Sequence, residues 1–186
     1  MKAEPSCECM GHLVTSLADS GVGDWLAEVR IACAPRTDQC PAGVGDNCVM
    51  LPRLIDALDA GLLGAPRPNA DLLIDALRCP LAGQALPVVR RYVGHDDPLA
   101  RAAALTFLVN FGGPDDTEVL LPRLDQEADA ELLEAVIDTL GSIGSTAAIL
   151  PLRALSQDER RAPHLRRAAI TAANDLAFPV AGERIG

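Results

Sequence analysis

A Leu-Pro pair recurs four times along this chain at nearly even spacing. The pairs are Leu51-Pro52, Leu86-Pro87, Leu121-Pro122 and Leu150-Pro151, and their prolines lie 35, 35 and 29 residues apart. Each pair opens a short apolar stretch with helical periodicity, and the first turn of a helix tolerates proline because the missing amide has no acceptor there. Self-similarity with a period of about 30 to 35 residues is typical of stacked helical units. The repeat therefore predicts an α-solenoid.

Composition supports an all-helical fold. Hydrophobic residues make up 49% of the 186 residues, but aromatic residues only 3%, so the core must consist mainly of Leu, Ala, Val and Ile. Alanine and leucine have high helix propensity, whereas sandwiches and barrels favour β-branched and aromatic residues. We therefore expect one all-α domain with about four antiparallel helix pairs and a terminal helix.

Helical periodicity sets the expected organisation. Residues 1–47 form a helical N-terminal cap with a Cys-rich insertion loop at 34–47, residues 48–177 form the repeats, and residues 178–186 form a tail. Within the repeats we expect helices over about 48–62, 69–79 and 84–93, a helix capped by Asp97 and stopped at Gly112, and a last helix over about 162–177. The fourth pair repeats the third at an offset of 32 residues. Apolar side chains of these helices, Leu99 and Leu150 among them, are expected to face the core.

Three stretches of the repeat region resemble a known family. They are Asp-Pro-Leu-Ala-Arg-Ala-Ala-Ala-Leu at 97–105, Ala-Val-Ile-Asp-Thr-Leu-Gly-Ser-Ile-Gly at 135–144, and Thr-Ala-Ala-Ile-Leu-Pro-Leu at 146–152. They resemble HEAT repeats of the short kind named after phycobilisome lyases, over residues about 48–177. The resemblance implies a right-handed superhelix whose second helices line a concave face, which in this family most often binds another protein. The insertion at 34–47 and the cysteines depart from the family pattern.

The net charge of −10 limits the classes of partner. Nucleic-acid binders usually carry a basic surface that matches the phosphate backbone, so we expect no nucleic-acid partner. No apolar run approaches the roughly 18 residues that a membrane span requires. We therefore expect a protein partner.

Six cysteines gather toward the N-terminal end: Cys7, Cys9, Cys33, Cys40, Cys48 and Cys79. An even number of cysteines around loops is typical of disulfides in exported proteins. Free thiols are one alternative, and a metal site that uses Cys7, Cys9 and His12 is another, although the two-residue gaps of structural zinc sites are absent. Disulfides predict a periplasmic or secreted protein whose signal peptide has been removed; a cytoplasmic protein is the alternative.

Arginines recur in the predicted second helices and suggest a binding surface. The candidate partner-binding residues are Arg53, Asp56, Arg90, Arg91, Arg123, Asp125 and Arg153. One interpretation is a ladder of ligand-binding residues on the concave face. The other is ion pairs between repeats and solvated surface, which contribute about 0 to 1 kcal/mol for each exposed pair.

Charge also segregates toward the C-terminal end. The stretch from Asp125 to Asp138 holds six acidic residues and no basic one, whereas Arg160, Arg161, Arg166 and Arg167 follow in the last pair. These two edges either steer a partner or neutralise each other across adjacent helices.

No catalytic signature stands out. His12, His95 and His164 fall in different repeats, and no nucleophile elbow, phosphate-binding loop or zinc-protease motif occurs. The leading hypothesis is therefore a non-enzymatic scaffold for protein–protein interaction without a cofactor. The alternatives are a metal-binding or redox protein that uses the N-terminal cysteines, and an enzyme of the lyase or glycosylase type on a HEAT scaffold.

Overall fold

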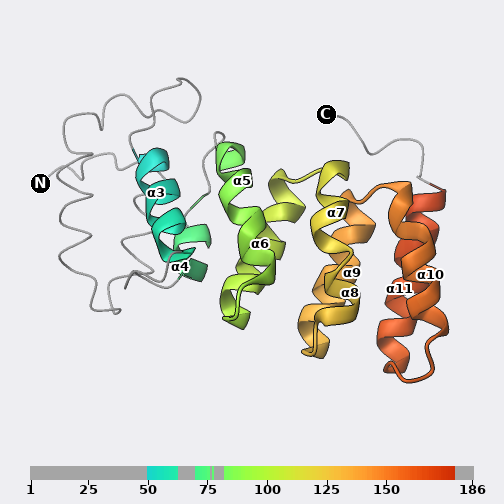
Figure 1. Ribbon diagram of the computed structural model, residues 1–186. Coiled ribbons are helices and arrows are strands. Elements are labelled where there is room, and N and C mark those ends of the chain that lie inside the picture. Colours follow the sequence, from blue (N-terminus) through green and yellow to red (C-terminus); the bar gives the residue numbers. More distant parts are fainter. Residues whose placement is uncertain (1–49, 63–69, 76, 78–81, 179–186) are drawn as a thin grey trace, which may run out of the picture. The chain divides into compact units, whose positions relative to one another are not determined.

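The computed structural model describes residues 50–62, 70–75, 77 and 82–178 (Figure 1). Every regular element in these ranges is helical. The chain divides into two compact units, residues 1–92 and residues 93–186, and each is described by itself. In the described part, no helix is long and apolar enough to cross a membrane.

The first unit packs short helices around leucine side chains. It contains α3 (Met50–Leu62), α4 (Ala70–Asp75), the 3-10 helix η2 (Ala82–Ala85) and α5 (Leu86–Val89), and α3 packs against the other three. Leu58 and Leu73 are fully buried. The Tyr92 hydroxyl donates a hydrogen bond to the Leu58 carbonyl oxygen, and burial raises the pKa of this tyrosine.

Two predicted helices of this unit are shorter or less regular than expected. The first is α4, which ends at Asp75, so Leu77 is buried outside the helix. The second was predicted as one helix over about 84–93. It is a succession of η2, α5 and the 3-10 helix η3 (Arg90–Gly94), which contains the boundary between the units. Short 3-10 segments are common at helix ends, and Pro87 adds to the irregularity because it lacks an amide donor.

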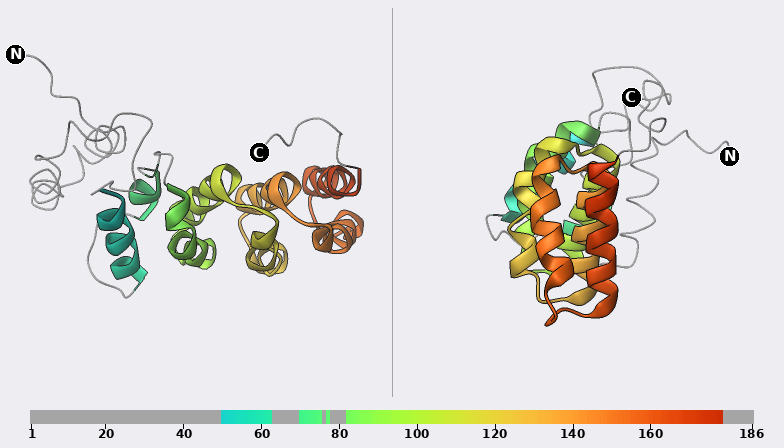
Figure 2. Two further views of the ribbon diagram at one scale, coloured as in Figure 1. Left: turned by 90° about the horizontal axis from the view of Figure 1, so that it is seen from above. Right: turned by 90° about the vertical axis from the view of Figure 1, so that its right-hand side faces the viewer.

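The second unit has two layers of helices. The first layer contains α6 (Pro98–Phe111), α9 (Ala130–Ile143) and α11 (Pro163–Ala177). In it α9 packs between α6 and α11. The second layer contains α7 (Thr117–Leu120), α8 (Arg123–Gln126) and α10 (Ile149–Gln157); α7 and α8 pack on α9, and α10 packs on α11. Figure 2 shows the two layers from above in its left-hand view.

The predicted offset of 32 residues holds in detail for α6 and α9. Both helices have 14 residues, and their N-caps, Asp97 and Asp129, accept hydrogen bonds from the first turn. Their C-caps are Gly112 and Gly144, whose amides donate hydrogen bonds to the carbonyl oxygens of Leu108 and Leu140 at 2.7 and 2.8 Å. The 3-10 helices η4 (Pro114–Asp116) and η5 (Thr146–Ala148) then begin at the same offset. Two successive repeats therefore share one local design.

One of the four Leu-Pro pairs does not open a helix. Leu121 and Pro122 form a turn between α7 and α8. The Leu121 amide still bonds to the Thr117 carbonyl at 2.9 Å, but Leu124 bonds only three residues back, to Leu121 at 3.2 Å. Proline has no amide to continue the helical ladder, so the second helix of this repeat is divided.

Two leucines expected in the core are exposed. Leu99 is 60% exposed and Leu150 is 76% exposed. In α6 the buried face is formed by Ala100, Ala104 and Leu108, and Leu99 falls outside it, at the position of Glu131 in the next repeat. In α10 the buried face is formed by Leu152 and Leu155. Each of these helices buries only one of its faces in the two-layer packing, and both leucines lie outside that face.

Candidate functional site

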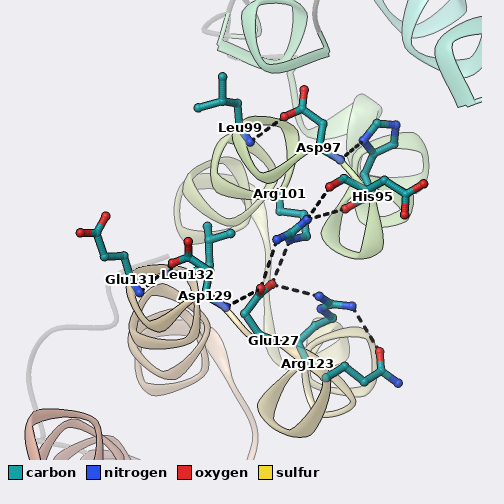
Figure 3. Close-up of polar contacts among 11 residues, drawn as sticks. His95, Asp97, Leu99, Arg101, Arg123, Glu127, Asp129, Glu131 and Leu132 are labelled. Carbon is teal, nitrogen blue, oxygen red and sulfur yellow. Dashed lines mark hydrogen bonds and ion pairs between the residues drawn. The ribbon is translucent and has the colours of Figure 1, made fainter. Parts of the chain in front are cut away.

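A buried carboxylate links consecutive repeats of the second unit. Glu127 lies in the connection between α8 and α9, and its side chain is 4% exposed. Arg101 of α6 donates two parallel hydrogen bonds to it, from Nε to Oε2 at 2.9 Å and from a terminal nitrogen to Oε1 at 3.1 Å. Arg123 of α8 donates a third, to Oε2 at 2.9 Å. Figure 3 shows the two guanidinium groups on either side of this carboxylate.

The same network reaches the turns that precede α6 and α9. The remaining terminal nitrogen of Arg101 donates to the carbonyl oxygens of His95 and Asp96, at 2.8 and 2.9 Å. Glu127 Oε1 also accepts from the Asp129 amide at 3.2 Å. Arg101 therefore joins the start of its own helix to the start of the next first-layer helix.

The charge of Glu127 is set by two opposing effects. Burial raises its pKa, but hydrogen bonds from Arg123, from Arg101 and from the Asp129 amide outweigh burial and leave the pKa below its ordinary value. Bidentate arginine–carboxylate pairs are among the strongest and most directional hydrogen bonds in proteins. A carboxylate that stays ionised with both oxygens occupied acts as a structural group, so this network fixes the spacing of the repeats.

The turns before α6 and α9 use the same capping arrangement. Asp97 Oδ1 accepts from the Leu99 amide at 3.0 Å, and Asp129 Oδ1 accepts from the Glu131 amide at 2.9 Å. Two residues earlier in each turn, a side chain accepts from the amide of the capping aspartate: His95 Nδ1 at 3.1 Å, and Glu127 Oε1. His95 is thus a cap residue.

The exposed side of the second layer carries two of the predicted binding residues of this unit, Asp125 and Arg153. We call its exposed residues the second-layer face: Glu118, Pro122, Asp125, Gln126, Leu150, Arg153, Ala154 and Gln157. Asp125 and Arg153, both predicted to bind a partner, are exposed there. In the described part of the chain, neither forms an ion pair. A charged surface that also exposes Leu150 has the mixed character of a protein-binding site.

Arg123 differs from the other predicted binding residues. Its side chain is 15% exposed and is held by Glu127, with a further hydrogen bond to Gln126 at 3.2 Å. This position matches the alternative interpretation of the arginines as structural ion pairs.

The remaining candidates lie in the first unit. Arg91 and Asp59 form an ion pair, and both side chains are 53% exposed. Asp56 is exposed on α3, and Arg90 is partly exposed in η3. For Arg53, also in α3, only the backbone is described. An exposed pair such as Arg91–Asp59 contributes little stability.

The cysteine predictions lie outside the described residues. These comprise Cys7, Cys9, Cys33, Cys40, Cys48 and Cys79, together with His12. Within residues 50–62, 70–75, 77 and 82–178, no group of three or more metal-binding side chains gathers. The disulfides and the alternative metal site both stay predictions.

The acidic and basic edges do not neutralise each other in the described part. Glu127 is one of the six acidic residues from Asp125 to Asp138. It is buried in its network and therefore contributes no charge to the surface. Arg160 and Arg161 both pair with Asp158 in the loop before α11, and the Arg160 guanidinium lowers the pKa of Asp158 to about 2. On α9, burial and the neighbouring Glu134 raise the pKa of Asp138. The remaining acids of α9 and the arginines of α11 thus form no ion pair among the described residues.

Sequence reasoning missed Arg101 and counted Glu127 as a surface acid. The two residues are 26 positions apart. Arg101 lies in the family-like stretch 97–105, but that stretch does not indicate its partner, and Glu127 lies outside the family-like stretches. The one available signal was the offset of 32, which places Glu127 two residues before a capping aspartate.

Comparison with known proteins agrees with this architecture. Residues 53–137 match the family model of HEAT repeats. No curated protein and no solved structure matches the chain. The matched range covers α3 to most of α9, and the helix pairs, the offset of 32 and the capped first-layer helices are those of stacked repeats. Residues 53–137 therefore match the HEAT-repeat family, and the described part of the chain has the all-α architecture of a solenoid.

Proposed function

We propose that this protein is a non-enzymatic scaffold that binds another protein through the second-layer face. HEAT repeats are generally protein-interaction scaffolds. In the resemblance described above, the second helices line the concave side of the stack. The observation that carries the proposal is the exposure of Leu150, at 76%, beside charged residues without described ion pairs.

The chemistry of this face supports a protein ligand. Leu150, Arg153 and Gln157 lie along the exposed side of α10, and Asp125 lies on α8. Covering a large apolar side chain with a partner is favourable. Charges of both signs that form no ion pair among the described residues can add specificity and accelerate association. Glu127 is held ionised by its arginines, so it is unsuited to general acid–base catalysis near neutral pH.

The experiment is a comparison of variants of the full chain in binding a partner isolated with the wild-type protein. Leu150→Asp and Arg153→Glu should each weaken binding by about tenfold or more, since central interface residues contribute most of the affinity. Thr106→Asp and Ser142→Asp, on exposed positions of α6 and α9, serve as controls and should bind like the wild type. If the second-layer variants bind normally while the first-layer variants do not, the proposal is wrong.

A further inference from the structure

The second-layer helices of two consecutive repeats are joined at both ends. The Thr117 hydroxyl oxygen, at the start of α7, accepts a hydrogen bond at 2.8 Å from the amide of Ser145, which precedes η5 and α10. At the other end, Arg161, which follows α10, donates a hydrogen bond to the Leu124 carbonyl oxygen of α8 at 3.2 Å. The helical stretch from α7 to α8 therefore runs parallel to α10, with their N-terminal ends together and their C-terminal ends together.

Two exposed stripes lie side by side on the second-layer face as a result. Glu118 and Asp125 are seven residues, or about two helical turns, apart, and both are exposed although a turn divides α7 from α8. Leu150 and Gln157 of α10 have the same spacing and are exposed as well. The offset of 32 places Glu118 beside Leu150 and Asp125 beside Gln157. Two acids thus adjoin a stripe whose leucine is 76% exposed.

The charge of this surface is unbalanced. Glu118 and Asp125 form no ion pair in the part of the chain that the structure describes, and Arg153 is the one basic residue of the second-layer face. Arg123 does not belong to this face, because its side chain is 15% exposed and is bound to Glu127. A surface with more acid than base, on a chain with a net charge of −10, attracts a cationic partner.

The spacing of the two acids favours a helical partner. Seven residues of helix place Glu118 and Asp125 about 10 Å apart along the stripe. A partner helix matches this distance with side chains at i and i+7, which lie on one face. In an extended segment, residues about 10 Å apart are three positions apart and point to opposite faces. An extended segment therefore cannot present two bases to both acids.

We propose that the partner presents a basic amphipathic helix to the second-layer face. Two Lys or Arg side chains of this helix, at i and i+7, lie over Glu118 and Asp125, and its large apolar side chains lie over Leu150. Arg153 sets the orientation, because a base placed over α10 would meet a like charge. This inference rests on the proposed function and names the chemistry of the partner.

The first test is a selection with the full-length protein at low salt. The probe is a phage-displayed library of alanine-based helical peptides of about 20 residues, long enough to be helical alone, with randomised positions. Enriched peptides should carry Lys or Arg at i and i+7 and large apolar residues on the adjoining stripe. Enrichment of acidic or uncharged peptides, or of none, would overturn the inference.

Variants of the full chain then locate the bound peptide. Fluorescence anisotropy should show that E118K/D125K raises the dissociation constant of an enriched peptide by about tenfold or more. The matched control is E131K/D138K, which reverses two exposed acids with the same spacing on α9 and should bind like the wild type. A peptide whose two bases are changed to Glu should bind E118K/D125K more tightly than it binds the wild type.

Leu150→Asp separates this inference from the proposed function. If Leu150→Asp weakens peptide binding but E118K/D125K does not, the second-layer face binds a partner without the basic stripe. The inference is then wrong and the proposed function stands. If neither variant weakens binding, both are wrong.

Discussion

At the scale of single residues, Glu127 joins two consecutive repeats of the second unit. It accepts four hydrogen bonds, from Arg101 twice, from Arg123 and from the Asp129 amide. Its two arginines are 13% and 15% exposed. A buried ion pair contributes little over a well-packed apolar pair, but the loss of one partner leaves buried charge without compensation.

Glu127→Ala should therefore destabilise the protein strongly. We expect a loss of about 3 to 5 kcal/mol in the free energy of unfolding, because two guanidinium groups remain partly buried without an anion. Urea denaturation followed by circular dichroism measures it. Glu131→Ala, an exposed acid four residues away, is the control and should change stability by no more than about 0.5 kcal/mol. Equal effects of the two substitutions would contradict the structural role of Glu127.

Acid should weaken the same network. The pKa of Glu127 is lower in the folded protein than its ordinary value of 4.5, so the unfolded chain binds the proton more readily. The stabilisation by Glu127 is therefore complete above about pH 4.5 and is lost as the pH falls below that value. Thermal unfolding between neutral and acid pH should show a smaller pH dependence in Glu127→Ala than in the wild type. Parallel pH profiles of the wild type and Glu127→Ala would contradict this role of Glu127.

The cysteines require a separate measurement. Six thiols paired as three disulfides lower the intact mass by about 6 Da. We expect this deficit, and no alkylation before reduction, in protein purified without reductant. Six alkylated thiols would instead favour the cytoplasmic alternative, and a native mass excess that disappears on denaturation would favour the metal site.

At the scale of single elements, local signals predicted the ends of helices well. Asp97 was predicted as an N-cap and Gly112 as a stop, and both predictions are confirmed because capping depends on neighbouring residues. The Leu-Pro pairs were less reliable. Leu121-Pro122 divides a helical stretch instead of opening one. That stretch already begins with η4 at Pro114, eight residues before Pro122. The exposure of Leu99 and Leu150 depends on which helices pack together, which periodicity alone does not specify.

The capping aspartates allow a prediction for α9. Asp129→Ala removes the acceptor for the Glu131 and Leu132 amides, and should cost about 1 kcal/mol of stability. Asp138→Ala in the same helix should cost nothing measurable, and should relieve the repulsion from Glu134 by up to about 0.5 kcal/mol. Chemical denaturation of the two variants tests this difference in sign. The expectation fails if Asp138→Ala is the more destabilising of the two.

At the scale of the whole molecule, the period of the repeat was sufficient to predict an all-α solenoid. The family match over residues 53–137 confirms the architecture, because repeat spacing reflects one unit of stacking. The Arg101–Glu127 contact was beyond sequence reasoning, since it joins positions that only the fold brings together. The partner was equally beyond it, because stacked helices accept many surfaces without a change of core.

The proposed function requires that a protein contacts the second-layer face in the cell. Site-specific photo-crosslinking inside cells of the source organism tests it most directly, with the probe at Leu150 or Gln157 on that face and at Thr106 or Ser142 on the first layer. If the second-layer face binds a protein, one discrete protein adduct should form from the second-layer positions and none from the first-layer positions. Adducts from the first-layer positions alone, or none from any position, would contradict it.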